Sequence, residues 1–359
     1  MDVEPVEAVV GVSLIALALL SVLMVRPNPV TVFPAMREAT ARSVASTVAY
    51  LYVWEYAYGD LDPSEAQAVI ENWVDAVSRD SSLAVRVELN LSNGTQILQD
   101  SWSYQVGDLS SGDVYVVQKP SPVYLAPNDT AVGEIVFCRD PYGMEVPGGV
   151  DPLRLTAVFY DKRSRQPLDV GTVSISAQYT CRTDCPCVNT TICSLIDPSL
   201  NGQASEEGFL YTFDQEKSLL TCEDANGTTV ALCPIPGPIS VTASYSGNAS
   251  ATASGTASLQ GVPRALSWLT LSMRNASVGQ TVVASYAPSA SFRVYSLVDG
   301  RVLLTGSGVS LSIDLSDPFE VLPGPLVVEA VDGSFTYRDA FFVRPYIVFT
   351  RVSMGGTPP

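Results

Sequence analysis

One uninterrupted apolar segment near the N-terminus constrains this chain more than any other feature. Residues Ala8 to Val25 carry no charge. As a helix they would span about 27 Å, close to the ~30 Å hydrocarbon core of a bilayer. A cleaved signal peptide would need a basic leader and a small-residue exit, whereas Asp2, Glu4 and Glu7 make this leader acidic. We therefore predict a retained single-pass helix that contacts the lipid bilayer through residues 8–25, in preference to a buried core helix.

The signals for membrane topology disagree. Arg26 lies directly after the apolar segment, so the positive-inside rule favours a cytoplasmic location for the residues that follow the predicted helix. Asn-x-Ser/Thr sequons and clustered cysteines instead favour export into an oxidising exterior. Because one arginine is a weak signal, we expect most of the chain to be extracellular. The asparagines predicted to carry N-linked glycans are Asn90, Asn93, Asn128, Asn189, Asn226, Asn248 and Asn275.

Composition excludes several functional classes for the predicted extracellular part of the chain. The 359 residues include 37 acidic and 20 basic side chains, a net charge of −17, so we expect no nucleic-acid partner. Histidine is absent, which removes Ser-His-Asp and Cys-His catalysis and histidine-ligated metals. Paired carboxylates could still hydrolyse glycosides, but no spacing singles out such a pair. We predict no enzyme activity, no catalytic or metal-binding residues and no cofactor.

The rest of the chain divides into four segments, which predict a mainly β fold. Prolines make 26–34 a linker, and 35–125 is predicted to be a small membrane-proximal α+β module. Within this module, the sequence Asp62-Pro63-Ser64-Glu65 is typical of a helix start. Beyond it, alternating polarity and regularly spaced turns indicate β-sandwiches at 126–262 and 263–359. Asp299-Gly300 and Asp332-Gly333 are typical of tight hairpin turns of the primed type within the second sandwich.

Two stretches of the β segments resemble Ig-like repeat domains of bacterial and archaeal proteins. Residues 241–259 (VTASYSGNASATASGTASL) are similar to the last two strands of such a domain, in which a V-T-A-x-Y-x-G-N strand precedes a Ser/Thr-rich strand. Residues 276–283 (ASVGQTVV) are similar to the start of one. The resemblance implies Ig-like sandwiches on a cell surface, which we take to be archaeal.

The N-terminus is similar to the mature end of archaeal type IV pilin-like proteins. Residues 3–10 (VEPVEAVV) precede the apolar helix, and Glu7 would be fifth if Val3 were first. This resemblance implies a filament subunit assembled through the hydrophobic helix. The chain departs from the pattern because no Lys/Arg-Gly cleavage site precedes these residues and Pro27 and Pro29 interrupt the helix.

The cysteines gather in the first predicted sandwich. In an oxidising compartment we predict disulfides among six of them, with Cys222–Cys233 as the first choice of pair. A Cys₄ zinc site is the alternative, although the usual C-x₂-C pairs are absent. Cys138 is left over, either as a buried thiol or as a link between two copies. The six cysteines are Cys181, Cys185, Cys187, Cys193, Cys222 and Cys233.

Five aromatic residues alternate at 50–58, where the first helix of the module is expected to end. Their spacing is typical of a strand, and their rings could stack on sugars or lie at the lipid headgroups. We favour burial within the module. The residues are Tyr50, Tyr52, Trp54, Tyr56 and Tyr58.

These observations predict a membrane-anchored, N-glycosylated extracellular structural or adhesion protein of the cell envelope. Its expected partners are the bilayer, its own glycans, and either further copies or other envelope proteins. A pilin-like filament subunit ranks second, because the −17 charge opposes close self-packing. A surface receptor or glycan-binding module ranks third.

Overall fold

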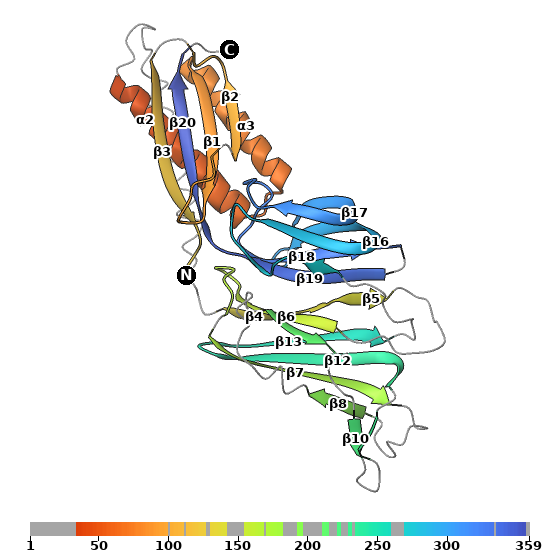
Figure 1. Ribbon diagram of the computed structural model, residues 1–359. Coiled ribbons are helices and arrows are strands. Elements are labelled where there is room, and N and C mark those ends of the chain that lie inside the picture. Colours follow the sequence, from red (N-terminus) through yellow and green to blue (C-terminus); the bar gives the residue numbers. More distant parts are fainter. Residues whose placement is uncertain are drawn as a thin grey trace.

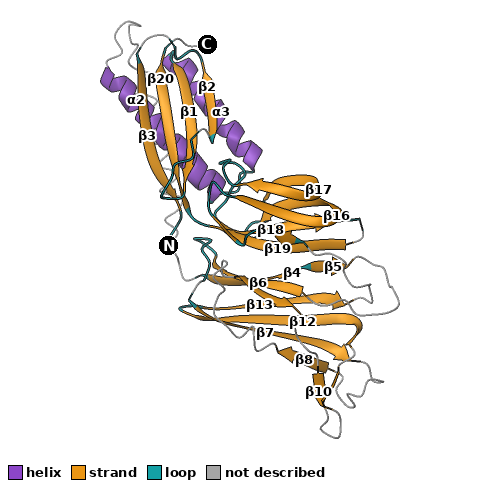
Figure 2. Cartoon of the chain, viewed as in Figure 1, coloured by secondary structure: helices purple, strands orange, loops and turns teal. Residues whose placement is uncertain are grey.

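The computed structural model describes parts of the chain between residues 34 and 356. The predicted transmembrane helix (8–25) lies outside the described residues. None of the described helices is long and apolar enough to cross a membrane. The described chain is mainly β with a small helical part (Figure 2). The described ranges are 34–99, 101–110, 113–126, 130–141, 154–168, 170–181, 192–196, 210–214, 221–223, 229–231, 234–259, 269–333 and 335–356.

The N-terminal module consists of two helices packed on one face of a four-stranded antiparallel sheet (Figure 1). Val85, Val87 and Leu89 alternate along the first strand and share a core with Val48 and Ile70 of the two helices. Burial of this face provides the main driving force for the module. The elements are α2 (Pro34–Tyr50), α3 (Pro63–Ser81), β1 (Ala84–Ser92), β2 (Trp102–Val106), β3 (Val114–Val123) and β20 (Tyr346–Gly355), and the strand order is β2-β1-β20-β3.

Helix α3 begins where the sequence predicts. Pro63 is its first residue, and the Glu65 carboxylate accepts a hydrogen bond from the Asp62 backbone N–H at 3.3 Å. This contact completes a capping box, which satisfies N–H groups that have no partner within the helix.

Strand β20 is the main departure from the predicted domain boundaries. The sequence pattern placed residues 346–350 in the second sandwich, but β20 lies in the module sheet between β1 and β3. Its Val352 pairs with Val87 on one side and Val117 on the other. A period-two pattern identifies a buried face but not the sheet that supplies the neighbouring strands. The module therefore combines residues 34–123 with 346–355, which corrects the predicted boundaries 35–125 and 263–359.

The aromatic run at 50–58 is helical, which corrects its strand-like appearance. Residues Leu51–Ala57 extend α2 as a π-helix, η1. Tyr52 and Tyr56 are buried, whereas Tyr50 and Trp54 are exposed. Since residues four apart lie on the same side of a helix, the alternating rings separate onto two faces.

The first β-sandwich contains two described sheets, with strand orders β13-β12-β7-β8 and β4-β6-β9. Phe159 and Tyr245 pack between the sheets, with ring centroids 5.6 Å apart. A separate hairpin is formed by β10 (Thr221–Glu223) and β11 (Thr229–Ala231). The sandwich strands are β4 (Ala131–Phe137), β6 (Arg154–Asp161), β7 (Gly171–Cys181), β8 (Ile192–Ile196), β9 (Leu210–Asp214), β12 (Pro234–Gly247) and β13 (Ser250–Leu259).

The sheet that contains β6 is a middle layer of the molecule. Residues 155–160 are buried without alternation, as is typical of a strand covered on both faces. On the face opposite β12, Val158 and Tyr160 pack against Val327 and Phe342 of the C-terminal unit. The two β units therefore share a continuous stack of layers (Figure 1).

The C-terminal unit is one seven-stranded sheet rather than two separate sheets. Its longest strand, β16, pairs with β14 and β17 before a register irregularity, and with β17 and β18 after it. The sheet thereby curls around its own core. Strand β5, from the segment assigned to the first sandwich, also joins this sheet by pairing with β19. The strands are β5 (Arg139–Pro141), β14 (Thr270–Leu271), β15 (Asn275–Ala276), β16 (Thr281–Ser296), β17 (Val302–Asp314), β18 (Gly324–Val331) and β19 (Phe335–Val343).

Both predicted hairpins of this unit form, but their turns are not of the primed type at Asp-Gly, because neither Asp299 nor Asp332 has a positive φ. Asp299-Gly300 joins β16 to β17, and Asp332-Gly333 joins β18 to β19. The glycines have φ angles of 73° and 75°, in the left-handed region that favours glycine.

Helix α2 and strand β20 run in opposite directions along the module. The Tyr52 hydroxyl, just beyond α2, lies 3.0 Å from the Tyr346 hydroxyl at the start of β20. The Pro34 end of α2 and the Gly355 end of β20 consequently lie together, at the end of the molecule remote from the β units (Figure 1).

Candidate functional site: a buried junction between the modules

The structure describes the backbone at three of the six cysteines predicted to form disulfides. Cys181 ends β7, Cys193 lies in the neighbouring strand β8, and Cys222 lies in the hairpin strand β10. The disulfide set, including the pair Cys222–Cys233, stays a prediction. The cysteines outside the described residues are Cys185, Cys187 and Cys233.

Cys138, which the sequence leaves over, lies between β4 and β5. It is 5% exposed, and its sulfur lies 3.8 Å from the Thr156 hydroxyl. Of the two predicted roles for Cys138, this burial favours a thiol inside the fold over a covalent link to a second copy.

The sequon asparagines lie in different environments. Asn93 and Asn248 are exposed, and Asn275 is partly buried. Asn90 is 8% exposed within β1, so the folded sheet argues against a glycan at this member of the predicted set. The three sequons outside the described residues are those of Asn128, Asn189 and Asn226.

The buried face of η1 reaches the C-terminal unit through the turn at 314–321, which we call the clasp turn. The Tyr52 hydroxyl donates to the Pro318 carbonyl at 2.8 Å, and the Tyr56 hydroxyl donates to the Val321 carbonyl at 3.4 Å. Phe319 of this turn packs against both tyrosine rings and, at 5.3 Å between centroids, against Trp102. The clasp turn thus inserts an aromatic side chain into the module core.

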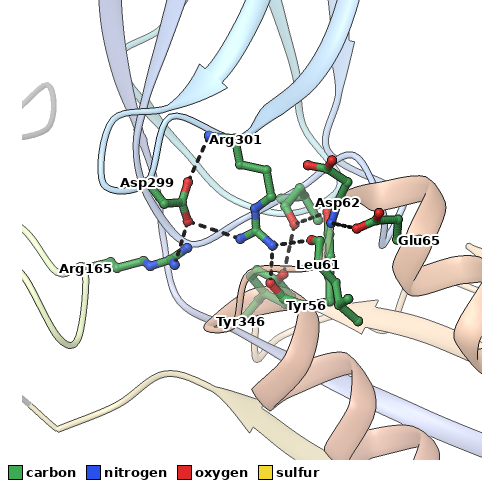
Figure 3. Close-up of polar contacts among 9 residues, drawn as sticks. Tyr56, Leu61, Asp62, Glu65, Arg165, Asp299, Arg301 and Tyr346 are labelled. Carbon is green, nitrogen blue, oxygen red and sulfur yellow. Dashed lines mark hydrogen bonds and ion pairs between the residues drawn. The ribbon is translucent and has the colours of Figure 1, made fainter.

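Arg301 is the central polar contact between the module and the C-terminal unit (Figure 3). It follows the Asp299-Gly300 turn, and its side chain is 4% exposed. One guanidinium nitrogen donates to the carbonyls of Tyr56 and Leu61, both at 2.6 Å. These carbonyls belong to the end of η1 and the connection to α3, so Arg301 fixes the module where its two helices meet.

Asp299 extends this cluster to the first sandwich. Its carboxylate accepts from Arg301 at 3.3 Å and from Arg165 at 3.0 Å (Figure 3). Arg165 is buried in the turn after β6 and has a φ of 59°, unusual for a residue other than glycine. Because two guanidinium groups share one carboxylate, the cluster carries excess positive charge, and burial lowers the pKa of Arg165 despite the attraction of Asp299.

Aromatic rings surround this charge. The guanidinium carbon of Arg301 lies 5.2 Å from the Tyr56 ring centroid, and that of Arg165 lies 5.3 Å from the Tyr58 centroid. Such cation–π contacts stabilise a desolvated guanidinium. Burial raises the pKa of Tyr58 to about 12 and that of Tyr56 well above its ordinary value. These phenols consequently stay neutral at physiological pH.

The clasp turn also carries carboxylates at its margin. Burial raises the pKa of Asp317, although a hydrogen bond from the Phe319 backbone N–H opposes the change. Burial raises the pKa of Glu320 as well, and the negative charges of Asp317 and Asp314 add to this effect.

The polar groups of the junction are used to hold modules together. Arginine, carboxylate and tyrosine side chains from three modules contact one another and main-chain carbonyls. In the described part of the chain, His, Cys, Asp and Glu form no group of three or more suited to a metal ion. The sequence identified Asp299 only as a turn residue and gave no signal for Arg165 or Arg301, because their partners are remote in the chain.

A separate cleft lies where the first sandwich meets the C-terminal unit. It encloses about 330 Å³. One side is formed by the turn after β6 and by Asn248, and the other by Asn275 and the connection from β19 to β20. The lining residues are Asp161, Gln166, Pro167, Leu168, Asn248, Asn275, Phe342, Val343, Arg344 and Pro345.

Comparison with known proteins gives no family assignment. No protein-family model and no curated protein matches the chain. The structure of murine CEACAM1b is 10% identical and covers 54% of this chain and 98% of its own, with a TM-score of 0.17. A tetra-tandem repeat from the extending region of a large adhesion protein is 14% identical, covers 72% and 66%, and has a TM-score of 0.19.

A third solved structure is the native conformation of E. coli alpha-2-macroglobulin. It is 13% identical and covers 73% of this chain but 22% of its own, with a TM-score of 0.18. At such TM-scores none of the three structures supports an argument about function. The architecture assigned above rests on the strand pairing of this chain itself.

Proposed function

We propose that this protein is a membrane-anchored extracellular structural or adhesion protein of an archaeal cell envelope. Residues 8–25 form the anchor, the α+β module is the base, and the two β units project from it. Disulfides and N-linked glycans protect the exposed part. The protein acts through its shape and surface and is assigned no enzymatic activity.

The observation that carries this proposal is the buried junction. A chain that displays β units at a distance from a membrane needs a base that resists bending. The clasp turn, Arg301 and Asp299 tie all three modules together through desolvated contacts. Relative motion of modules is the default when their interface is small and polar, whereas here one apolar cluster joins the module to the C-terminal unit and a second joins that unit to the first sandwich.

The orientation of the module supports the same role. The Pro34 end of α2, which follows the predicted linker, lies at the end of the molecule opposite the β units (Figure 1). A membrane at that end would leave both β units pointing away from it.

Surface labelling of intact cells tests the topology. An amine-reactive biotin reagent that does not cross membranes should label Lys162, which is exposed in the first sandwich. Peptide mass spectrometry should find the biotin before cell lysis, and alkaline washing should leave the protein in the membrane fraction. Labelling of Lys162 only after lysis would show that the bulk lies inside and would overturn the proposal.

A filament subunit is the second candidate, favoured by one observation. Tyr50 and Trp54 are 54% and 47% exposed on the outer face of the helix, and large exposed apolar patches often mark contacts between proteins. Electron microscopy of native material should show filaments that a Trp54→Ser variant weakens, if this candidate holds. Dispersed particles in detergent would favour the first proposal.

A further inference from the structure

We infer that an N-linked glycan on Asn248 packs into the cleft between the first sandwich and the C-terminal unit and joins the two. The inference rests on the proposed extracellular location. It identifies one predicted sequon as structural and assigns an occupant to the cleft, namely the first sugars of the chain's own glycan.

The position of Asn248 is the first reason. It lies in the turn between β12 and β13, is exposed, and lines the cleft. The Tyr245 hydroxyl lies 3.3 Å from its side-chain oxygen. Its amide nitrogen, the atom that carries an N-linked sugar, has no hydrogen-bond partner among the described residues.

The chemistry of the opposite wall is the second reason. Asn275 and Arg344 form a polar pair there, since Arg344 donates from Nε to the Asn275 oxygen at 2.9 Å. Beside this pair, the cleft is lined by apolar residues such as Leu168 and Pro345. Sugars combine hydroxyl groups with apolar ring faces, so amide, guanidinium and apolar groups together suit them. The cleft volume of about 330 Å³ is at the lower end of the range for small-ligand pockets.

Asn275 is the less suitable attachment point, although it also belongs to a sequon. It is partly buried and lies in β15, which pairs with β19. Arg344 further restricts its side chain. We therefore assign Asn275 to contacting the glycan and Asn248 to carrying it.

Attachment follows the ordinary chemistry of N-glycosylation. The Asn248 amide nitrogen forms a bond to the anomeric carbon of a lipid-phosphate-linked oligosaccharide. The bond from that carbon to the phosphate oxygen breaks, the lipid phosphate leaves with the electron pair, and the nitrogen loses one proton. Neither oxidant nor reductant is consumed.

The test removes the glycan without changing Asn248. Ser250→Ala destroys the sequon Asn248-Ala249-Ser250, and Ser250→Thr preserves it. Thr95→Ala destroys the exposed sequon at Asn93 and controls for glycan loss elsewhere. Each full-length variant is purified from the native host and studied by glycopeptide mass spectrometry and by hydrogen exchange.

The readouts are backbone amides on both cleft walls. Leu168 N–H donates to the Phe159 carbonyl, and Arg344 N–H donates to the Ala276 carbonyl. In Ser250→Ala both amides should exchange about tenfold faster, the effect expected when polar contacts that stabilise the closed cleft are lost. Ser250→Thr and Thr95→Ala should exchange at the wild-type rate.

Two results would overturn the inference while leaving the extracellular location intact. One is a glycan on Asn93 with none on Asn248, and the other is a glycan on Asn248 whose loss leaves both amides unchanged. Absence of glycan from every sequon together with labelling of Lys162 only after lysis would instead reject the proposed function itself.

Discussion

One side chain, Arg301, makes the central polar contacts between the module and the C-terminal unit. Its contacts differ from those of a surface ion pair because the guanidinium is buried and its acceptors are carbonyls of another module. Removing one member of such a cluster leaves the others desolvated without a partner, which costs far more than losing an exposed pair. The sequence context, an arginine after an Asp-Gly turn, does not reveal this role, because the acceptors belong to a segment far away in the chain.

Replacement of Arg301 tests this view of the junction. Arg301→Met should lower the free energy of unfolding by about 2–4 kcal/mol, because the carbonyls of Tyr56 and Leu61 lose their donor. Denaturant titration followed by circular dichroism measures the change. Arg42→Met is the matched control, since Arg42 pairs with Glu38 on the exposed face of α2 and should cost less than about 0.5 kcal/mol. Equal losses in the two variants would contradict a special role for Arg301.

Glu320 provides a pH-dependent probe of the clasp turn. Its pKa is raised by burial and by neighbouring negative charges, so its ionised form destabilises the folded state above that pKa. This penalty disappears as the pH falls below the ordinary carboxyl pKa of about 4. Glu320→Gln should therefore raise the unfolding midpoint at pH 7, and the gain should shrink as the pH is lowered towards 4.

Thermal denaturation across that pH range checks the prediction for Glu320. Asp80→Asn, at an exposed carboxylate of α3, removes the same charge and serves as the control; it should change the unfolding midpoint at pH 7 by less than Glu320→Gln does. A gain from Glu320→Gln that persists unchanged at pH 4 would contradict the electrostatic explanation.

Among the elements, β20 decides whether the module can exist. It supplies the central partner of both β1 and β3, so its loss leaves β3 without any strand neighbour. Deletion of residues 346–359 should unfold the module, whereas deletion of 357–359 should change nothing. Limited proteolysis with mass spectrometry should find cleavage within α2 and α3 only in the longer deletion. A module that resists proteolysis without β20 would contradict the assigned topology.

Local chemistry made many elements predictable. The capping residues of α3 and the two Asp-Gly hairpins require few partners beyond their own neighbours, so the sequence specified the positions of these elements correctly, although not the turn type of the hairpins. Other features depend on contacts between residues that are distant in the sequence. These are the sheet position of β20, the pairing of β5 with β19, and the separation of the η1 rings onto a buried and an exposed face. Alternating residues such as Tyr346 and Val348 suit either sheet equally well, which is why the predicted domain boundary was wrong at that point.

At the scale of the molecule, the module and the C-terminal unit share one apolar core. Tyr52, Phe319 and Phe341 belong to the same buried cluster, although they come from different modules. We therefore expect both modules to lose their structure together. Hydrogen exchange at rising denaturant concentration should show β1 and β18 losing protection at the same midpoint.

A variant of the clasp turn tests this shared cooperativity. Phe319→Ala removes the ring that bridges the two modules and should lower the common midpoint, at a cost of about 3–5 kcal/mol. If β1 opened at a clearly lower denaturant concentration than β18 in the wild-type protein, the modules would be independent and the rigid-base proposal would fail.

The position of β20 has a consequence for how the protein is made. A ribosome delivers α2, α3, β1 and β3 early, but it delivers the strand that completes their sheet only after both β units. Domains generally fold in the order of their synthesis, and here the part nearest the predicted anchor must wait for β20. The sheet of the module is thus completed only after both β units have been translated and, for an exported protein, have passed through the membrane.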